Sequence, residues 1–480
     1  MSTLDLLWPW LLGALDVAIA LLVSAHIVLT KHDDRSAIAW ITVVWLSPFV
    51  GAAAYALFGV NRIKRRALRL RRPKRRGAPA AGDAPQQSPP PEPTAGAPFV
   101  HFQSSLIRKF RHPPFTGGNR VEPLRHGDAA YPEMLAAIGA AKESVALSTY
   151  IFNDDPLGRR FVDALAEAEA RGLAVRVLID GVGALYSLPP VVGRLRRREV
   201  RAERFLASLL PWRMPYLNLR NHRKILVVDG RIGFTGGLNI KRGHLLADKP
   251  RWPTGDLHFR IEGPAVAQLM AVFADDWAFA TGERLSDEPW FPPLPLRGET
   301  VMRAIASGPH QEVGALRLTL MGALTQVRQR LRIATPYFLP DEEIVSLLSV
   351  AALRGVEIDI VIPEASNQFY IKWAESASFP RLLEAGCRIS LEPPPFDHAK
   401  FALADDEWVL FGSSNWDARS LRLDFELDCE CFDPALAGEL EDLFLEKQAR
   451  SRAVTLKKLR ARGLALRLRD GVARLFRPFL

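Results

Sequence analysis

His222-Arg-Lys-Ile-Leu-Val-Val-Asp229 and His398-Ala-Lys-Phe-Ala-Leu-Ala-Asp405 share the spacing H-x-K-x-x-x-x-D, with one copy in each half of the 480-residue chain. The agreement continues downstream of both copies. A glycine lies fourteen positions and an asparagine seventeen positions after each histidine, namely Gly236 and Asn239 in the first copy and Gly412 and Asn415 in the second. One match of this kind is weak evidence, whereas two with matching flanks indicate duplication. We therefore predict two modules that each supply half of one active site.

The secondary structure predicted before each motif is duplicated as well. Each half has a strand, a helix that ends at a glycine, and a second strand. The predicted ranges are helix 131–142, strand 144–152, helix 156–171 and strand 174–179 in the first half, and strand 330–336, helix 341–354 and strand 356–362 in the second. This repeat predicts an α/β fold of two tandem βα domains related by a pseudo-twofold axis.

Composition sets the predicted domain boundaries. Apolar, proline-rich and basic stretches each mark a segment that is distinct from the α/β repeat. The segments are a transmembrane hairpin with a basic juxtamembrane stretch (1–72), a Pro-rich linker (73–98), a first domain (99–286), a connector (287–298), a second domain (299–446) and a basic amphipathic C-terminal helix (447–480).

Two apolar runs near the N-terminus, 6–30 and 37–60, are 25 and 24 residues long. Each is long enough to cross about 30 Å of hydrocarbon, so we predict a transmembrane helical hairpin. Buried core helices are the alternative, which the all-round apolar character of both runs disfavours. Asp16 and His26 are costly inside the first span, and we expect them to face the partner helix or to mark a shorter, tilted span.

The formal net charge of +10 is concentrated in two flanks of the chain. Residues 62–76 hold ten Lys or Arg and no acid, and residues 447–480 hold eleven with only Asp470 against them. This pattern favours an anionic membrane surface over a nucleic-acid groove through the fold. The positive-inside rule places the first cluster, the N-terminus and the catalytic domains in the cytoplasm. The second cluster is compatible with a membrane-surface helix or with a helix docked on the catalytic domain.

The three cysteines, Cys387, Cys429 and Cys431, are too few for a disulfide framework. We expect them to be reduced, in a cytosolic environment, and to act as small apolar residues in strands. A Cys-x-Cys pair without a nearby histidine is weak evidence for zinc.

The repeated motif predicts convergent polar groups. In a strand, alternate residues point the same way, so each motif's His and Lys should share a side. A hairpin turn at Asp229-Gly230, or at Asp405–Glu407, then returns the chain so that small residues let a ligand approach the backbone. The candidate phosphate-binding residues there are Asn239 and Gly237 in the first half and Asn415 and Ser413 in the second.

A third element repeats without gaps, at 256–264 and at 426–434. Both copies alternate polar with apolar residues, which is typical of a strand with one buried face. Both also open with a carboxylate, Asp256 or Glu426. We expect these two carboxylates to hold a histidine tautomer each and to raise the pKa of the histidine.

Two His, two Lys and two Asn meeting at one point suit a phosphodiester. The Lys and Asn side chains would hold the non-bridging oxygens, one neutral His would attack phosphorus, and the other would protonate the leaving oxygen. The near symmetry of the halves leaves open which histidine attacks. No metal and no cofactor are expected, because the sequence has no evident carboxylate cluster of the kind that binds magnesium.

These motifs resemble the phospholipase D superfamily over about residues 100 to 446. Further stretches are similar to the bacterial cardiolipin synthase family, namely Ser36–Trp40 running into Pro48, Gly51, Tyr55 and Phe58–Gly59, and then Thr335–Pro340, Leu382–Gly386 and Arg477–Leu480. The chain departs from the usual pattern at Asp16 in the first span and at the proline run Pro393–Asp397, which we expect to shape one wall of the cleft and so to affect acceptor specificity.

The resemblance implies roles for the candidate site. His222 would form a phosphatidyl-histidine, and His398 would protonate the departing glycerol and then deprotonate the incoming hydroxyl. Asp256 and Glu426 would orient the imidazoles. The candidate catalytic residues are the six of the two motifs, His222, Lys224, Asp229, His398, Lys400 and Asp405, of which the resemblance makes the two aspartates structural more than chemical.

The expected function is a phosphatidyltransferase, multi-pass in the bacterial inner membrane, that joins two phosphatidylglycerols into cardiolipin and releases glycerol. A hydrolytic phospholipase D is the near alternative, because water can replace the alcohol. A nuclease is disfavoured by the hairpin and by the acidic middle of the chain, so no nucleic-acid partner is expected, and a non-catalytic scaffold is disfavoured by the intact double motif. The sequence does not indicate an oligomeric state.

Overall fold

The structure is a computed structural model of the whole chain. It describes residues 3–31, 34–59, 98–107, 113–187, 189–206, 219–286, 288–308, 314–421 and 424–477. The predicted basic cluster at 62–76 and almost all of the Pro-rich linker lie outside these residues. Two units, Met1–Arg72 and Pro73–Leu480, are each described by themselves.

The N-terminal unit contains the predicted apolar hairpin in a modified form. Helix α1 (Thr3–Thr30) includes a stretch, Trp10–Thr30, that is long and apolar enough to cross a membrane. We had predicted one continuous helix for the second run, and this is wrong. It is divided into α2 (Asp34–Leu46), α3 (Pro48–Ala54) and a π-helical turn (Tyr55–Gly59). The division falls at Ser47, because Pro48 has no backbone N–H with which to continue α2.

Polar and aromatic contacts join the arms of this hairpin. His26 Nδ1 lies 3.0 Å from the Tyr55 hydroxyl, and the Tyr55 ring also packs edge-on against Trp40. His26 therefore faces the partner helices, as one of the two sequence-based alternatives proposed. Asp16 Oδ1 has no hydrogen-bond partner among the described residues.

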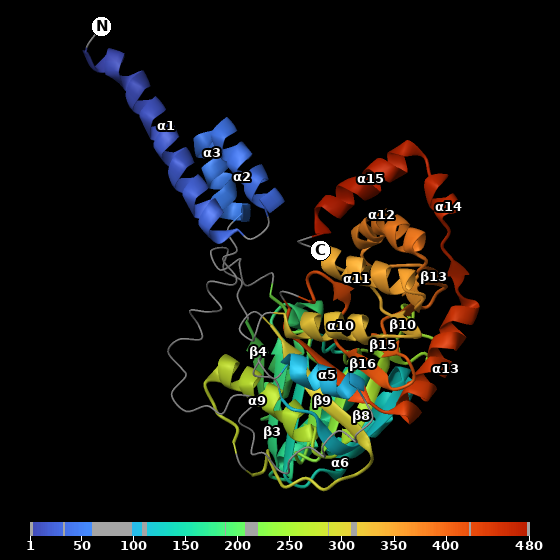
Figure 1. Cartoon of the computed structure of the whole chain (residues 1–480). Coiled ribbons are helices and arrows are strands. Elements are labelled where there is room, and N and C mark those ends of the chain that lie inside the picture. The colour runs from blue at the N-terminus through green and yellow to red at the C-terminus, as the bar shows by residue number, and fades with distance from the viewer. Residues whose placement is uncertain are drawn as a thin grey trace. The chain divides into compact units, whose positions relative to one another are not determined.

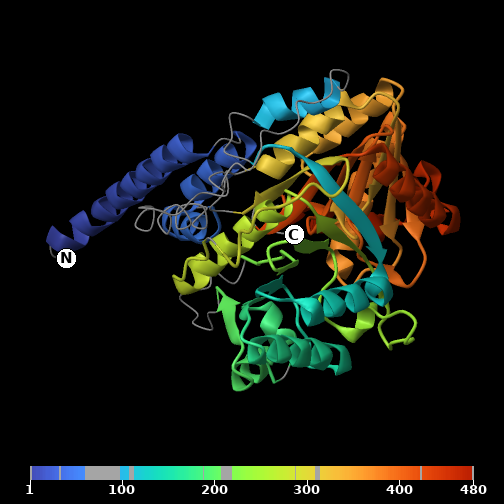
Figure 2. The ribbon, with the colours of Figure 1, turned by 90° about the horizontal axis from the view of Figure 1, so that it is seen from below.

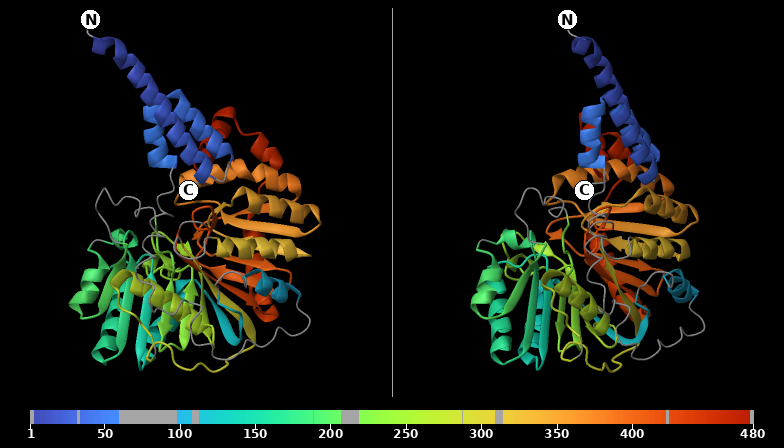
Figure 3. Two further views of the ribbon diagram at one scale, coloured as in Figure 1. Left: turned by 60° about the vertical axis from the view of Figure 1, so that its left-hand side comes forward. Right: turned by 90° about the vertical axis from the view of Figure 1, so that its left-hand side faces the viewer.

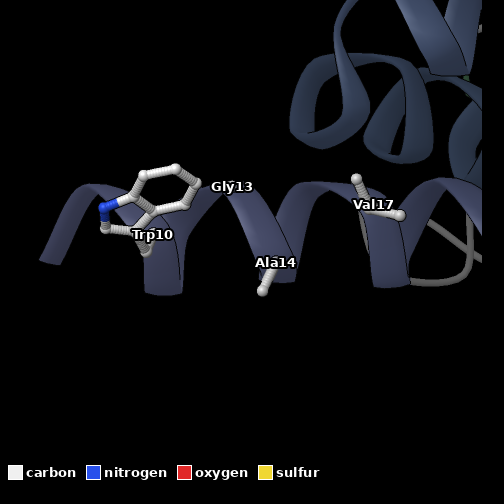
Figure 4. Close-up of a pocket in the computed structure, with 4 residues that line it drawn as sticks. All are labelled: Trp10, Gly13, Ala14 and Val17. Carbon is white, nitrogen blue, oxygen red and sulfur yellow. The ribbon is translucent and has the colours of Figure 1, made fainter. Parts of the chain in front are cut away.

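A shallow hollow runs along α1 of this unit (Figure 4). Its lining residues, Trp10, Gly13, Ala14 and Val17, follow helical spacing and carry no ionisable group. The lining of the hollow is apolar, as is usual for a segment whose length and composition suit a membrane span.

One fifteen-stranded sheet organises the second unit (Figure 1), in the order β19-β13-β12-β10-β15-β16-β18-β9-β1-β8-β6-β5-β2-β3-β4. The first-half strands are β1 (Thr116–Arg125), β2 (Ser144–Thr149), β3 (Ala174–Asp180), β4 (Arg201–Phe205), β5 (Ile225–Val228), β6 (Ile232–Gly236) and β8 (Leu257–Glu262). The second-half strands are β9 (Thr300–Ser307), β10 (Arg330–Ala334), β12 (Glu357–Pro363), β13 (Arg388–Glu392), β15 (Phe401–Ala404), β16 (Trp408–Gly412), β18 (Glu426–Phe432) and β19 (Arg452–Ala453).

Pairing in this sheet follows the predicted pseudo-twofold symmetry. Outward from the centre, β1-β8-β6-β5-β2-β3-β4 matches β9-β18-β16-β15-β10-β12-β13 strand for strand. The halves join where β1 pairs antiparallel with β9, with Asn119 opposite Thr300. In each half β5 or β15 runs antiparallel to its neighbours, whereas β2 and β3, like β10 and β12, run parallel. Figures 2 and 3 show the green first half and the orange second half side by side.

Helices cover the sheet in both halves and build two separate cores. The helices are α5 (Pro98–Ile107), α6 (His126–Ala140), α7 (Pro156–Ala170), α8 (Val191–Arg197), α9 (Val266–Thr281), α10 (Ala315–Gln326), α11 (Glu342–Leu353), α12 (Phe369–Ala385), α13 (Pro434–Arg450), α14 (Leu456–Arg460) and α15 (Leu464–Leu475). Predicted helices 156–171 and 341–354 correspond to α7 and α11, each of which begins after an aspartate whose side chain caps a backbone N–H.

Two predictions about the C-terminal third have to be corrected. Residues 447–480 do not form one basic helix: α13 ends at Arg450, β19 pairs with β13 at the sheet edge, and α14 and α15 follow. Also, strand β18 does not have one exposed face, because all seven of its residues are buried between β16 and β9. Its acidic side chains find partners there, such as Glu430 with Arg303.

Candidate active site

Each histidine of the repeated motifs lies on backbone that crosses to the other half. Short strand β14 (Phe396–Asp397) pairs in parallel with β7 (Thr254–Gly255), and the His398 N–H donates to the Gly255 carbonyl at 2.8 Å. In the same way Asn221 bridges to Phe425, and the His222 N–H donates to the Phe425 carbonyl at 2.9 Å. We had predicted that the His and Lys of each motif lie on a strand. This is wrong, because the His-x-Lys segments 222–224 and 398–400 directly precede β5 and β15 and are not part of them. The two halves cannot separate without moving both histidines.

The side chains of these histidines also meet the opposite half. His398 Nδ1 lies 2.9 Å from Oδ2 of Asp256, and His222 Nδ1 lies 3.2 Å from Oε1 of Glu426. Both carboxylates are fully buried, whereas about a fifth of each histidine side chain is exposed. Because Nδ1 of each ring is directed to the buried carboxylate, Nε2 is the nitrogen left for chemistry.

The two lysines take equivalent positions in the two halves. Lys224 Nζ donates to the carbonyl of His222, and Lys400 Nζ donates to the carbonyl of His398, both at 2.5 Å. Both lysines are nearly buried. The charges of both lysines lower the pKa of both histidines, so each lysine lies close enough to interact with the histidine of the other half as well as with its own.

The predicted phosphate-binding residues divide into two groups. Asn239 Oδ1 accepts from the Ile151 N–H at 3.0 Å, which leaves its amide nitrogen as a donor, and Asn415 Nδ2 lies 3.3 Å from the Ser420 hydroxyl. Gly237 and Ser413, in contrast, lie against the buried carboxylates. A Cβ on Gly237 would be 2.0 Å from Oδ1 of Asp256.

The hydroxyl of Ser413 donates to Oε2 of Glu426 at 2.5 Å and accepts from the Leu427 N–H at 2.9 Å. In the first half, Asp256 Oδ1 itself accepts the equivalent N–H, that of Leu257, at 2.9 Å. Because this hydroxyl is buried and already used, the predicted phosphate contact of Ser413 could come only through its backbone. The two halves therefore position the histidine-binding carboxylate differently. In the first half the backbone N–H bonds directly to Asp256, beside Gly237, and in the second half it bonds to the Ser413 hydroxyl, which in turn holds Glu426.

The aspartates that close the motifs lie away from this centre. Asp229 accepts hydrogen bonds from the N–H groups of residues 142–144, and Asp405 accepts from those of residues 328–330. Both adopt left-handed backbone, with φ of 51° and 52°. Each holds the hairpin turn to the start of β2 or β10, so the geometry gives both a structural position.

Loss of hydration dominates the protonation of the site. Burial lowers the pKa of His222 to about 3 and the pKa of His398 well below its usual range. The expectation that the carboxylates would raise both pKa values is wrong, because this burial outweighs the nearby negative charges. Burial also lowers the pKa of Lys400 to about 7 and raises the pKa of Glu426 to about 7. A phosphate anion beside these groups would stabilise protonated His and Lys.

Sequence reasoning missed three neighbours of the histidines. The Tyr150 ring lies against His222, with centroids 4.4 Å apart. Asp424, bonded to Arg419 at 3.0 Å, raises the pKa of His222, whereas the positive charge of Lys241 lowers that of His398. The available signal was position: Tyr150 directly follows β2, and Asp424 lies two residues before Glu426.

One group of possible metal ligands includes a motif histidine. Ligand atoms of His222, Asp424 and Glu426 lie within 4.8 Å of one another. Asp424, however, already accepts from Arg419 and from the Arg220 N–H, and Glu426 accepts from Ser413. Oε1 of Glu426 has no hydrogen-bond partner among the described residues, but it lies at ion-pair distance, 3.2 Å, from Nδ1 of His222. Because donors already occupy the other carboxylate oxygens, the Nδ1–H of His222 suits this remaining oxygen better than a cation does.

Family models match both halves of the chain. The model described as "Cardiolipin synthase, PLD-like domain" matches residues 134–277 and 320–448. A second, described as "Phospholipase_D-nuclease N-terminal", matches residues 18–59 in the apolar hairpin.

Curated relatives match over almost their full length. A protein named cardiolipin synthase A from Pseudomonas aeruginosa is 32% identical over 480 residues, covering 98% of this chain and 96% of that protein. A cardiolipin synthase from Geobacillus kaustophilus is 31% identical over 469 residues, covering 97% and 92%. Among solved structures, a phosphatidylserine synthase from Haemophilus influenzae superposes with a TM-score of 0.61 over 79% of this chain and 100% of that chain. At 15% identity this last likeness concerns the fold alone.

Proposed function

This chain is an enzyme of the cardiolipin synthase family, with phospholipase D-like domains, and on that premise we propose that it transfers a phosphatidyl group between two phosphatidylglycerols. The products are cardiolipin and glycerol. The observation that carries the proposal is the crossed pairing of His222 with Glu426 and of His398 with Asp256. Two imidazoles with inward Nδ1 atoms and free Nε2 atoms in one lysine-rich centre are what an in-line, two-step displacement at phosphorus needs.

In the first step, Nε2 of neutral His222 attacks the phosphorus of the donor lipid. The P–O bond to the departing glycerol breaks, and the imidazolium of His398 gives its Nε2 proton to that oxygen. Lys224, Lys400 and the two asparagines Asn239 and Asn415 hold the non-bridging oxygens and offset the charge that builds on them. The phosphatidyl group is then bonded to His222.

In the second step, the roles of the two histidines are complementary. A hydroxyl of the second phosphatidylglycerol attacks phosphorus while neutral His398 takes its proton, and the P–N bond to His222 breaks. Glu426 keeps the Nδ1 proton of His222 in place, and Asp256 stabilises the positive charge that His398 carries before the first step and regains in the second. The proton that His398 gives to glycerol in the first step is restored in the second by the hydroxyl of the incoming lipid, so the enzyme ends each cycle as it began.

The apolar hairpin suits this substrate. We propose that α1 crosses the bacterial inner membrane together with the α2–α3 arm, and that catalysis takes place on the cytoplasmic side, where both lipids are present in the leaflet. The Pro-rich sequence at 73–98 would then act as a tether between the hairpin and the catalytic unit.

The test is a product analysis. Membranes that contain the full chain receive phosphatidylglycerol with a labelled headgroup glycerol and labelled acyl chains. Cardiolipin with free glycerol in equal amounts supports the transferase. Phosphatidic acid with glycerol identifies a hydrolase instead, and no turnover at all points to a non-catalytic scaffold. His222→Ala and His398→Ala serve as matched inactive controls.

A further inference from the structure

Helix α15 presents its apolar face outward. Leu464, Leu468, Val472 and Leu475 are spaced as one helical stripe and remain 71%, 60%, 55% and 73% exposed. On the opposite face, Asp470 and Ala473 are the buried residues of the helix. A surface helix of a globular domain ordinarily does the reverse, with its apolar stripe against the core.

Polar contacts hold α15 in this inverted orientation. The Arg469 guanidinium lies 4.4 Å from the centre of the Trp373 ring of α12, and buried Asp470 pairs with Arg462 at 2.6 Å and with Arg469 at 2.8 Å. Figure 1 shows α15 lying over α12, on the side away from α11. The Asp470 pairs lie within residues 462–470, whereas Arg469 on Trp373 and buried Ala473, which clusters with Leu339 and Ala374, join this face of α15 to the rest of the catalytic unit. The leucine stripe on the other face is left exposed.

The charge beside the stripe indicates what that partner is. Exposed Arg467 and Arg474 flank it, and α14 adds Lys457 and Lys458, whereas Arg460 of α14 is paired with Glu384 at 2.7 Å. Between residues 451 and 477 the sole acid is Asp470, which is already paired. Aliphatic side chains bordered by arginine and lysine match the interface of a bilayer that contains anionic lipid, where the stripe enters the acyl region and the cations meet phosphates.

Aromatic residues lie beside this surface and, in a second group, beside the catalytic centre. Exposed Phe369, at the start of α12, packs on Trp373 with ring centroids 4.9 Å apart. The Tyr337 hydroxyl, nearer the site, is hydrogen-bonded to Asn367 in the loop before α12. From Tyr337 the contacts run to Phe396 at 6.3 Å and from Phe396 to His398 at 6.1 Å.

We propose that the exposed face of α15, with Phe369 at the start of α12, is a docking surface that holds the catalytic unit against an anionic bilayer, with the His398 side of the site next to the lipid. The docking itself is independent of the reaction, whereas its use in delivering substrate rests on the proposed function. With the unit docked, the phosphate of a lipid could reach His398 while its acyl chains stay in the leaflet and out of water.

Depth-dependent quenching tests the docking directly. The native cysteines are buried, so a single surface cysteine can carry a fluorescent label in the full chain. We place it by Leu468→Cys or Leu475→Cys, with Leu353→Cys as the control. Leu353 is equally exposed, at 74%, but lies at the opposite end of β10 from the site, where the next residue, Arg354, bonds to Val327.

In vesicles of phosphatidylglycerol and phosphatidylcholine, we expect a lipid-borne quencher to act at least several-fold more strongly on labels at 468 and 475 than on the label at 353. A water-soluble quencher should show the reverse order. Equal behaviour at all three positions overturns the proposal. Labels at 468 and 475 that are shielded from both quenchers also overturn it, because they would indicate a protein partner or a second copy.

A kinetic experiment separates docking from chemistry. Leu464→Gln, Leu468→Gln, Val472→Gln and Leu475→Gln are combined in one variant, with Val350→Gln and Leu353→Gln on α11 as the control. We expect the KM for phosphatidylglycerol in vesicles to rise about tenfold in the α15 variant alone, while turnover of a short-chain, dispersed phosphatidylglycerol stays unchanged. An unchanged KM contradicts the proposal. If the unaltered chain turns over neither substrate, the proposed function fails, and the quenching result still decides the docking.

Discussion

Asp256 of the first half lies 2.9 Å from Nδ1 of His398 of the second half. The reciprocal pair, Glu426 and His222, crosses in the opposite direction. Neither half therefore contains a complete histidine–carboxylate pair of its own. The pairing explains why a duplicated module remains joined in one sheet through β1 and β9, since a module alone would leave its histidine without a partner.

The crossed pairing predicts the effect of Asp256→Asn. An amide cannot stabilise the imidazolium of His398, so we expect kcat to fall by about 100-fold or more, the range that loss of acid–base assistance usually costs. The measurement is cardiolipin formation from phosphatidylglycerol under saturating conditions. Asp406→Asn is the matched control, because this acid is exposed at a hairpin turn, and it should leave kcat within about twofold. Equal rates for Asp256→Asn and the unaltered chain would contradict the assigned position.

The residue pairs Gly237 with Asp256 and Ser413 with Glu426 hold equivalent positions in the two halves, but we expect that exchanging only one residue of a pair for its counterpart lowers activity. Ser413→Gly removes the hydroxyl that holds Glu426, and loss of such supporting contacts typically costs about 10- to 100-fold in activity. The double variant Ser413→Gly/Glu426→Asp recreates the first-half arrangement and should recover part of that loss. Gly237→Ser should be the most damaging, because its Cβ meets Asp256. A double variant no more active than the product of its two singles would show that the pairs are not equivalent.

Asp229 is predicted to affect stability more than chemistry. Its carboxylate accepts from three consecutive backbone N–H groups, and hydrogen bonds to a charged group contribute about 1.5–3 kcal/mol. Asp229→Asn keeps a residue that tolerates the left-handed backbone but removes the charge. We expect the Tm to fall by at least several degrees, while kcat at low temperature stays within about threefold. A variant with unchanged Tm and abolished kcat would contradict the structural role and would show that Asp229 takes part in the chemistry.

We expect the pH dependence of kcat/KM to reflect the titration of the Lys400 side chain. A lysine holds phosphate oxygens while protonated, and burial lowers the pKa of Lys400 to about 7, so its charge is present below that pH and lost above it. We expect kcat/KM to decline as pH rises through about 7. Lys400→Arg keeps its charge at all accessible pH values, so its alkaline limb should move upward by about one unit or more, at a lower maximum. An alkaline limb at the same pH in both proteins would exclude Lys400 as its origin.

The sequence predicted those features that depend on local pattern. The two motifs, the strand–helix–strand order around 144–179 and 330–362, and the hairpin turns at Asp229 and Asp405 follow from periodicity and turn chemistry. The pseudo-twofold arrangement follows from the repeat itself. These predictions are confirmed in β2, β3, β10 and β12 and in the antiparallel β5–β6 and β15–β16 pairs.

Features that depend on distant neighbours could not be predicted. Which carboxylate meets which histidine is decided by the pairing of β14 with β7 and of Asn221 with Phe425, residues more than 140 positions apart in the chain. Burial of β18 on both faces and the low pKa of His222 likewise arise from the sheet around them, and not from the alternation of polar residues in 426–434. The break at Ser47 was readable, since Pro48 follows it directly, but the hydropathy of the run concealed it.

The central claim is that His222 carries the phosphatidyl group between two half-reactions. The most direct test is to mix the full chain with labelled phosphatidylglycerol, stop the reaction within one turnover, and identify the modified peptide by mass spectrometry under conditions that preserve phosphohistidine. The account predicts an adduct on His222 that is absent in His222→Ala and that accumulates in His398→Ala when the donor has a good leaving group. An adduct on His398, or cardiolipin formed with no adduct on either histidine, would contradict it.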